Sequence, residues 1–203
     1  AGEDASLRAA TIGQSAERIA HALAQVALRE SISSRALRDP LTGLPNRTAL
    51  MQAVERRLAR IEAAARPFGV LIVDLDDFKD VNDQLGHAVG DRVLAAVGDA
   101  LAAHVRPGDL VARIGGDEFV VLLDSGDPDV MGATARRLID AVSASGPGGS
   151  LRTPASAGGV AVGWGDVSWD DAYQRADLLL YEAKAAGKDQ VVIGGLLGAA
   201  AQA

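Results

Sequence analysis

The sequence contains no cysteine among its 203 residues, so neither a disulfide nor a thiolate metal site is available to it. No apolar run approaches the length of a transmembrane helix, and no signal peptide is visible. The Gly-x-x-x-x-Gly-Lys-Ser/Thr pattern of P-loop proteins does not occur. These absences exclude several common classes of protein and direct attention to the acidic and glycine-rich segments.

Basic residues are also in the minority, with 20 Lys and Arg against 27 Asp and Glu and a net charge of −7. This balance argues against a broad footprint on a nucleic acid polymer. It leaves room for a single nucleotide, which a local cluster of lysines and glycine amides can hold. The length predicts one domain of about 150–170 residues plus an appendage. Because the sequence begins at Ala1 rather than Met, we expect it to be a piece of a longer sensor protein.

Two glycines and two acids, Gly115-Gly116-Asp117-Glu118, separate the apolar runs 110–114 and 119–123. This pattern is typical of a β-hairpin with the glycines and acids at its tip. Glycines without a Cβ let a bulky anion approach the backbone, and adjacent carboxylates suit a hard divalent cation. The alternative is an ordinary solvated turn.

A second acidic segment, Leu71–Asp77, reads as a buried strand that ends in three carboxylates, which packing alone does not explain. If this strand lies beside the hairpin, Asp74 meets Asp117 and Glu118 around one or two ions. Two such ions next to phosphate form a site for phosphoryl or nucleotidyl transfer.

Four ordered segments carry a family pattern: 39–47, 74–91, 113–119 and 176–189. Together they resemble the catalytic domain of the GGDEF family of diguanylate cyclases, over residues 39 to about 193. The resemblance implies an α/β fold of the palm-like nucleotidyl cyclase type. Its central mixed sheet contains an antiparallel hairpin and is flanked by helices, and a long N-terminal helix precedes it. No phosphodiesterase segment is recognisable.

The chain is expected to divide into a signalling helix at 1–38, the GGDEF domain at 39–194 and a disordered tail at 195–203. Apolar residues spaced four and three apart in the first segment favour a coiled coil, although Glu30 and Ser33 interrupt the seam. The alternative is one amphipathic helix that packs on its own domain. Within the domain, helices are expected at 47–65, 77–84, 91–104, 128–144 and 170–186, and strands at 69–75, 110–123 (the hairpin), 155–163 and 191–193.

The resemblance implies that Asp74, Asp117 and Glu118, with the Leu75 carbonyl, hold Mg²⁺ or Mn²⁺. It also places the acid at position 117 close to the reacting 3′-hydroxyl of the substrate. Asp117 then acts as the base, or metal coordination alone deprotonates that hydroxyl.

Asn82 and Asp91 are the guanine readers that the resemblance implies. A carboxylate can accept hydrogen bonds from guanine N1–H and N2–H₂ together, and adenine lacks that pair of donors. The alternative for Asp91 is an N-cap after Gly90. Leu94 either lines the base pocket or belongs to the core. The remaining substrate contacts that we expect are at the tip glycine, the helix start after the acidic strand and two late lysines, namely Gly116, Phe78, Lys79, Lys184 and Lys188.

Arg106-Pro-Gly-Asp109 matches the RxxD inhibitory site of the family, just upstream of the hairpin. Arg137 is expected to supply a second guanidinium. The alternative is a simple turn, which Pro-Gly favours.

The activity implied is the condensation of two GTP molecules into cyclic di-GMP and two pyrophosphates by a homodimer, with product inhibition and an upstream sensor domain. The rivals are a non-enzymatic GTP or cyclic di-GMP receptor, and a cyclase for mixed dinucleotides, against which Asp91 speaks. We expect this piece to be cytoplasmic, in a full-length protein that is free or membrane-anchored, with no nucleic acid polymer as partner.

Overall fold

The computed structural model describes residues 21, 36–64, 66–146 and 152–198. Arg38–Ala203 form one compact unit. The predicted signalling helix and its apolar seam lie almost entirely outside the described residues, so the coiled-coil hypothesis stays a prediction.

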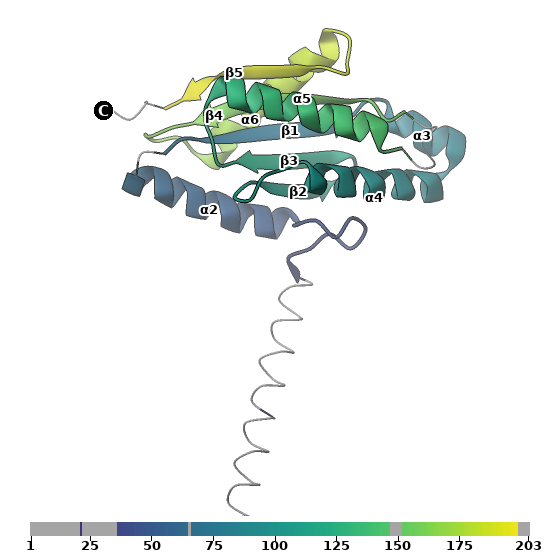
Figure 1. Ribbon diagram of the computed structural model, residues 1–203, viewed down its shortest axis with the longest axis horizontal. Helices are drawn as coiled ribbons and strands as arrows, with labels where there is room; N and C mark the ends of the chain where they lie inside the picture. The colour runs from purple at the N-terminus through teal and green to yellow at the C-terminus, as the bar shows by residue number, and fades with distance from the viewer. Residues whose placement is uncertain (1–20, 22–35, 65, 147–151, 199–203) are drawn as a thin grey trace, which may run out of the picture. The chain divides into compact units, whose positions relative to one another are not determined.

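The described unit is an α/β domain built on a five-stranded sheet in the order β2-β3-β1-β4-β5 (Figure 1). The β1–β3, β1–β4 and β2–β3 pairs are antiparallel, whereas β4 and β5 are parallel, so the sheet is mixed. The elements are α2 (Arg47–Ala64), β1 (Phe68–Leu75), α3 (Phe78–Leu85), α4 (His87–Ala103), β2 (Leu110–Gly115), β3 (Glu118–Leu123), α5 (Pro128–Ala144), β4 (Ala155–Val162), α6 (Trp169–Ala185) and β5 (Val191–Leu197). This order confirms the predicted fold class.

The central strand β1 is buried on both faces, which explains why its sequence is apolar throughout rather than alternating. Leu71 and Val73 pack in the core cluster that α4 and α5 cover. Val70 and Ile72 pack in the opposite cluster, which α2 and α6 cover. Helices therefore lie on both faces of the sheet (Figure 1).

Small residues in β4 allow α6 to approach the sheet closely. A Cβ added at Gly158 would lie 2.1 Å from the Leu180 backbone nitrogen and 2.2 Å from the Ala176 carbonyl oxygen. Because both contacts are to helix backbone, no side-chain movement relieves them. This close approach brings the lysines near the end of α6 to the acidic end of β1.

Helix α4 begins at His87 and not at the predicted residue 91. The break between the helices is Gly86, whose φ of 83° ends α3. Gly90 lies inside α4, and a Cβ there would lie 2.1 Å from the Asn82 Oδ1. Gly90 is therefore a packing glycine, and the alternative role of Asp91 as an N-cap is wrong.

Strand β5 continues to Leu197, four residues beyond the predicted end. Gly195, the predicted first residue of the disordered tail, falls with Gly194 at a register shift between the Gly159–Ile193 and Ala161–Leu196 pairs. After this irregularity Leu196 packs against the core. The predicted disorder is thus wrong for residues 195–197, and residues 199–203 lie outside the described part.

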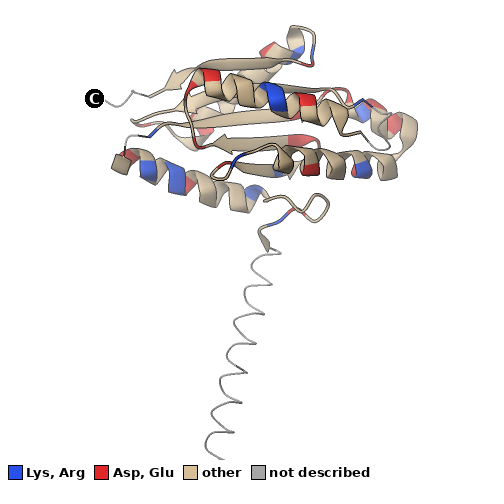
Figure 2. Ribbon diagram, viewed as in Figure 1, with Lys and Arg blue, Asp and Glu red and all other residues tan. Residues whose placement is uncertain are grey.

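Lys and Arg are interleaved with Asp and Glu on the described elements (Figure 2). Helix α2 carries Arg47, Arg56, Arg57 and Arg60, but Glu55 and Glu62 lie among them. In the part of the chain that the structure describes, no helix has both the length and the hydropathy to cross a membrane.

Candidate active site

The acidic end of β1 lies beside the hairpin, as the sequence predicted. Asp74 and Glu118 are direct Cα partners across the β1–β3 pair. Like charges that face each other in this way repel. The Lys184 Nζ, from the last turn of α6, lies 2.5 Å from the Asp74 Oδ1 and neutralises part of the charge.

The hairpin tip is a two-residue loop, Gly116-Asp117, between the paired residues Gly115 and Glu118. Gly116 has a φ of 52°, a left-handed conformation that glycine adopts without steric cost. Cβ atoms added at Gly115 and Gly116 would meet nothing within 4 Å, so this face of the loop is open. The tip can therefore admit a bulky ligand, as the glycine pattern indicated.

The Arg113 side chain stabilises the hairpin tip. Its Nε and one Nη donate to the Gly116 carbonyl at 3.0 and 2.7 Å, and its other Nη donates to the Asp39 Oδ1 at 3.0 Å. Asp39 also accepts from the Thr42 backbone and hydroxyl, both at 2.8 Å. Although partial burial opposes them, these bonds from Thr42 and Arg113 hold the pKa of Asp39 below its usual value. The loop before α2 is thus tied to the hairpin tip.

The electrostatics of the site suit a divalent cation. Burial, together with the nearby Asp117 and Glu118 carboxylates, raises the pKa of Asp74 although Lys184 opposes the shift. A bound cation would stabilise the charged form of a carboxylate in such an unfavourable environment. Glu118 instead accepts a hydrogen bond from the Tyr173 hydroxyl. Oxygen donors of this kind are what Mg²⁺ and Mn²⁺ prefer.

In the described ranges, no group of three or more His, Cys, Asp or Glu side chains is arranged so that it could hold a metal ion by itself. Mg²⁺ is typically held by only one or two protein carboxylates, while phosphate and water complete its shell. Asp74, Glu118 and the adjacent Asp117 fit such an open site, with the Leu75 carbonyl at the same strand end.

The three acids that end β1 have different environments. Asp76 is buried and accepts from the Ser156 hydroxyl at 2.9 Å and the Asp189 backbone amide at 2.9 Å, so it fixes the strand end. Asp77 is exposed at the start of α3, and the Lys188 Nζ lies 2.5 Å from its Oδ1. Lys188 lies in the turn that follows α6, with a φ of 64°.

The predicted guanine readers lie on the two helices beside this strand end. The Asn82 side chain on α3 packs against Gly90 of α4. Asp91 follows Gly90 directly, so Asn82 and Asp91 lie close to each other. Asp91 is exposed, whereas Leu94 is buried in the core, which favours the core role over the base pocket for Leu94. Phe78 is buried in the same core, so only its backbone remains for a ligand, and Lys79 is exposed.

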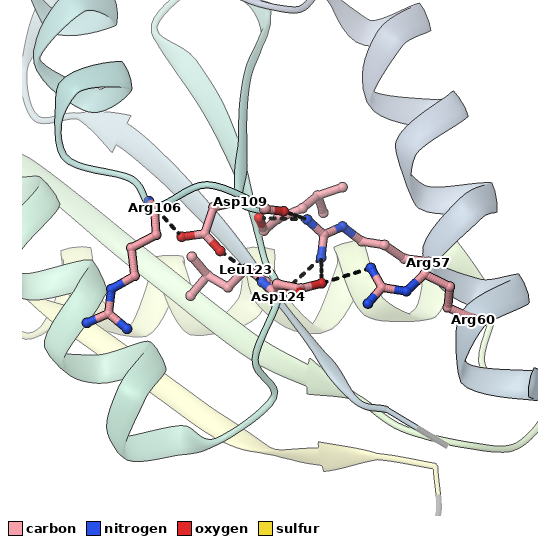
Figure 3. A network of polar contacts seen from close by, with 8 residues as sticks. Arg57, Arg60, Arg106, Asp109, Leu123 and Asp124 are labelled. Atoms are coloured by element: carbon pink, nitrogen blue, oxygen red, sulfur yellow. Dashed lines mark hydrogen bonds and ion pairs between the residues drawn. The ribbon is translucent and has the colours of Figure 1, made fainter. Parts of the chain in front are cut away.

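The RxxD segment forms a turn whose acid is already engaged (Figure 3). The two Asp109 carboxylate oxygens accept from the Arg106 amide at 3.1 Å and the Asp124 amide at 2.9 Å. The Arg106 guanidinium is exposed and points away from this cluster in Figure 3. Arg137 on α5 donates to the His104 carbonyl at 3.2 and 3.0 Å, which holds it close to the same segment.

Arg57, which the sequence interpretation passed over, anchors this turn to α2. Its guanidinium donates to the Gly108 carbonyl at 2.6 Å, to the Leu122 and Leu123 carbonyls at 3.3 and 3.2 Å, and to Asp124 at 3.2 Å (Figure 3). No local sequence pattern marks a buried arginine on an amphipathic helix, because in sequence it looks the same as an arginine on the solvent-exposed face. Tyr173 was missed for the same reason.

A family model described as "Diguanylate cyclase, GGDEF domain" matches residues 36–190. The diguanylate cyclase DgcP of Pseudomonas aeruginosa is 38% identical over 167 residues, which cover 81% of this chain and 25% of DgcP. The probable diguanylate cyclase DgcT of Escherichia coli is 36% identical over 161 residues, covering 77% of this chain and 35% of DgcT. The chain thus spans a quarter to about a third of the length of these curated relatives.

Solved structures agree with this match. The crystal structure of the diguanylate cyclase SiaD with its activator SiaC, from Pseudomonas aeruginosa, has a TM-score of 0.74 at 31% identity, covering 92% of this chain and 72% of SiaD. The coiled coil and GGDEF domain of DgcB from Caulobacter crescentus, in complex with c-di-GMP, has a TM-score of 0.77 at 27% identity, covering 87% of this chain and 97% of that one.

Proposed function

Because this chain belongs to the GGDEF domain family, we propose that it is the catalytic domain of a diguanylate cyclase. It condenses two GTP molecules into cyclic di-GMP and two pyrophosphates. The observation that carries the proposal is the pairing of Asp74 with Glu118 directly beside the open Gly116-Asp117 tip. Acids in excess, an open glycine loop and lysines converge there, as transfer of a nucleotidyl group from a triphosphate requires.

Asp74, Asp117 and Glu118, with the Leu75 carbonyl, would hold Mg²⁺ or Mn²⁺. Such an ion would supply positive charge to the transferring phosphoryl group and would make an oxygen bound to it easier to deprotonate. Lys184 already contacts Asp74, and Lys188 contacts Asp77. When a triphosphate is bound, both lysines leave these carboxylates and contact phosphate oxygens instead. Lys79 and the backbone amides at Phe78 and Gly116 contact the phosphates as well.

Each domain binds one GTP, and two domains face each other. The 3′-oxygen of each GTP attacks the α-phosphorus of the other, so that a P–O bond forms, the bond to the β-phosphate oxygen breaks and pyrophosphate leaves. Asp117 accepts the hydroxyl proton. One half-site cannot close the ring, and the homodimer is therefore part of the mechanism. The N-terminal segment links it to an upstream sensor.

Base choice depends on Asp91 and Asn82. The exposed Asp91 carboxylate accepts from the guanine N1–H and N2–H₂ edge, and the Asn82 amide supplies a donor and an acceptor to neighbouring ring atoms. ATP leaves that acid unpaired and binds less well. Product inhibition is assigned to the exposed Arg106, with Asp109 and Arg137 beside it, and Arg57 fixes the turn.

The test is incubation of the chain with GTP and Mg²⁺ followed by chromatography of the products, with ATP as a parallel substrate. The proposal expects cyclic di-GMP and pyrophosphate from GTP and no cyclic product from ATP alone. Binding of GTP or cyclic di-GMP without turnover, at protein concentrations that permit a dimer, would identify a receptor domain instead.

A further inference from the structure

The Tyr173 hydroxyl donates a hydrogen bond to the Glu118 Oε1 across 55 positions of sequence. Tyr173 projects from α6, which packs on the face of the sheet that α2 shares, whereas Glu118 starts β3. The bond therefore joins an outer helix to the acidic end of the β1–β3 pair.

The tyrosine ring is held in place by its neighbours. Trp169, one turn earlier on α6, packs against it with ring centroids 5.7 Å apart and planes tilted by 48°. Both rings line a pocket of about 240 Å³, which Arg47, Gly115 and Glu118 also help to line. The ring thus packs against Trp169 on its own helix, while its hydroxyl is directed at Glu118.

The neighbours of Glu118 on the strand pair do not fix the orientation of its carboxylate. Glu118 faces Asp74 across the strand pair and follows Asp117 in sequence, so neighbouring negative charge disfavours any single arrangement. A hydroxyl donor stabilises the charge without adding a competing cation, and it occupies one oxygen while leaving the other available.

We propose that Tyr173 is a positioning residue, which orients the Glu118 carboxylate for the divalent cation of the proposed cyclase. The inference rests on the proposed function, since it assumes that Glu118 is a metal ligand. Partners that orient a ligand in this way typically change metal affinity by about 10- to 100-fold when they are removed. Tyr173→Phe keeps the ring and its packing and removes the hydroxyl alone.

The experiment measures Mn²⁺ binding to the full chain, with a non-hydrolysable GTP analogue present, by the electron paramagnetic resonance signal of free Mn²⁺. Tyr181→Phe is the matched control, because it removes a hydroxyl from the same helix at a side chain that is 71% exposed. Glu118→Gln shows the effect of losing the ligand itself. Thermal unfolding of each variant, and turnover at increasing Mn²⁺, complete the comparison.

We expect Tyr173→Phe to weaken Mn²⁺ binding by about tenfold or more, Tyr181→Phe to match the wild type, and excess Mn²⁺ to restore turnover in Tyr173→Phe but not in Glu118→Gln. Normal Mn²⁺ affinity in Tyr173→Phe, with or without a lower unfolding temperature, would overturn the positioning role and leave the proposed function intact. A wild type that binds no Mn²⁺ would overturn both.

Discussion

Two polar clusters lie at opposite ends of the same pair of strands, and they are built on opposite principles. At one end of β1–β3, the Asp74–Glu118 pair carries acids in excess of its bases. At the other end, close to the Gly69–Leu123 pair, the Arg57 guanidinium donates to three carbonyls and a carboxylate. The acidic cluster can still gain from a bound cation, whereas the charge of Arg57 is already paired with Asp124.

We expect the acidic end to bind a ligand, whereas Arg57 and its acceptors, here called the clamp, hold parts of the fold together. Burial and like charge raise the pKa of Asp74, which is a cost that the fold carries at the acidic end. Arg57 loses solvent as well, but its donors gain acceptors from two different segments, so it joins α2 to the sheet and to the RxxD turn. Substitutions at the acidic end should therefore change chemistry, and substitutions at the clamp should change stability.

The largest effect is expected for Asp117→Ala. Loss of a carboxylate at the reacting oxygen should lower the rate of cyclic di-GMP formation by at least about 10²-fold. The unfolding temperature should stay unchanged, because the hairpin tip contributes nothing to the core. Product chromatography and thermal unfolding measure both, and near-normal synthesis by this variant would refute the assignment of the acidic end.

Asp91→Ala should weaken binding of a GTP analogue by about 2–4 kcal/mol, because the guanine donors lose a charged acceptor. Binding of an ATP analogue should hardly change. Calorimetric titration of both analogues checks this, and an unchanged affinity for the GTP analogue would remove Asp91 from the site.

At the clamp, Arg57→Met should lower the free energy of unfolding by about 2 kcal/mol, since it leaves buried carbonyls without a donor. Arg60→Met is the control. Arg60 lies 3.0 Å from the same Asp124 carboxylate, but its side chain is 52% exposed against 9% for Arg57, so its loss should cost less than about 1 kcal/mol. Denaturant unfolding measures both, and equal losses would mean that the clamp is only a surface ion pair.

The RxxD turn sharpens the comparison, because Arg57 holds its backbone while its own arginine is exposed. Arg106→Ala should raise the concentration of cyclic di-GMP needed for inhibition by at least about tenfold, since a charged hydrogen bond is lost. Initial turnover should remain. Progress curves with added cyclic di-GMP measure this, and a wild type without inhibition would leave the segment as a turn.

The smallest effect concerns the Arg113–Asp39 contact at the hairpin tip. The pKa of Asp39 is lowered in the folded state, so its ion pair with Arg113 stabilises the fold above the unfolded value of 3.8 and is lost as the pH falls through the folded value. Asp39→Asn keeps an acceptor oxygen and loses only the charge, so it should cost about 1 kcal/mol at neutral pH, with a difference that vanishes in acid. Denaturant unfolding at several pH values checks this, and a difference that grows in acid would contradict it.

The sequence predicted the architecture and the acidic end because both have local signatures. The apolar strand that ends at Asp74 and the Gly115-Gly116 tip identify themselves by pattern, and sheet pairing then brings Glu118 opposite Asp74. Helix α2 began as predicted, with the Asn46 side chain accepting from the Ala49 amide at 3.1 Å.

The rest depended on contacts between distant segments. Gly90 and Gly194 read as breaks, because a glycine required by close packing looks the same in sequence as one required by a turn. Arg57 and Tyr173 lie on amphipathic helices where an arginine or a tyrosine is ordinary. Their partners are 66 and 55 positions away in sequence, so no local pattern marks them.

The division between binding site and clamp is tested most directly by the rise in unfolding temperature that Mg²⁺ and a non-hydrolysable GTP analogue produce together. The wild type should show such a rise. Arg57→Met should start from a lower temperature and rise by the same amount, whereas Glu118→Gln should start near the wild type and rise far less. A full rise in Glu118→Gln, or none in Arg57→Met while it is folded, would contradict the account.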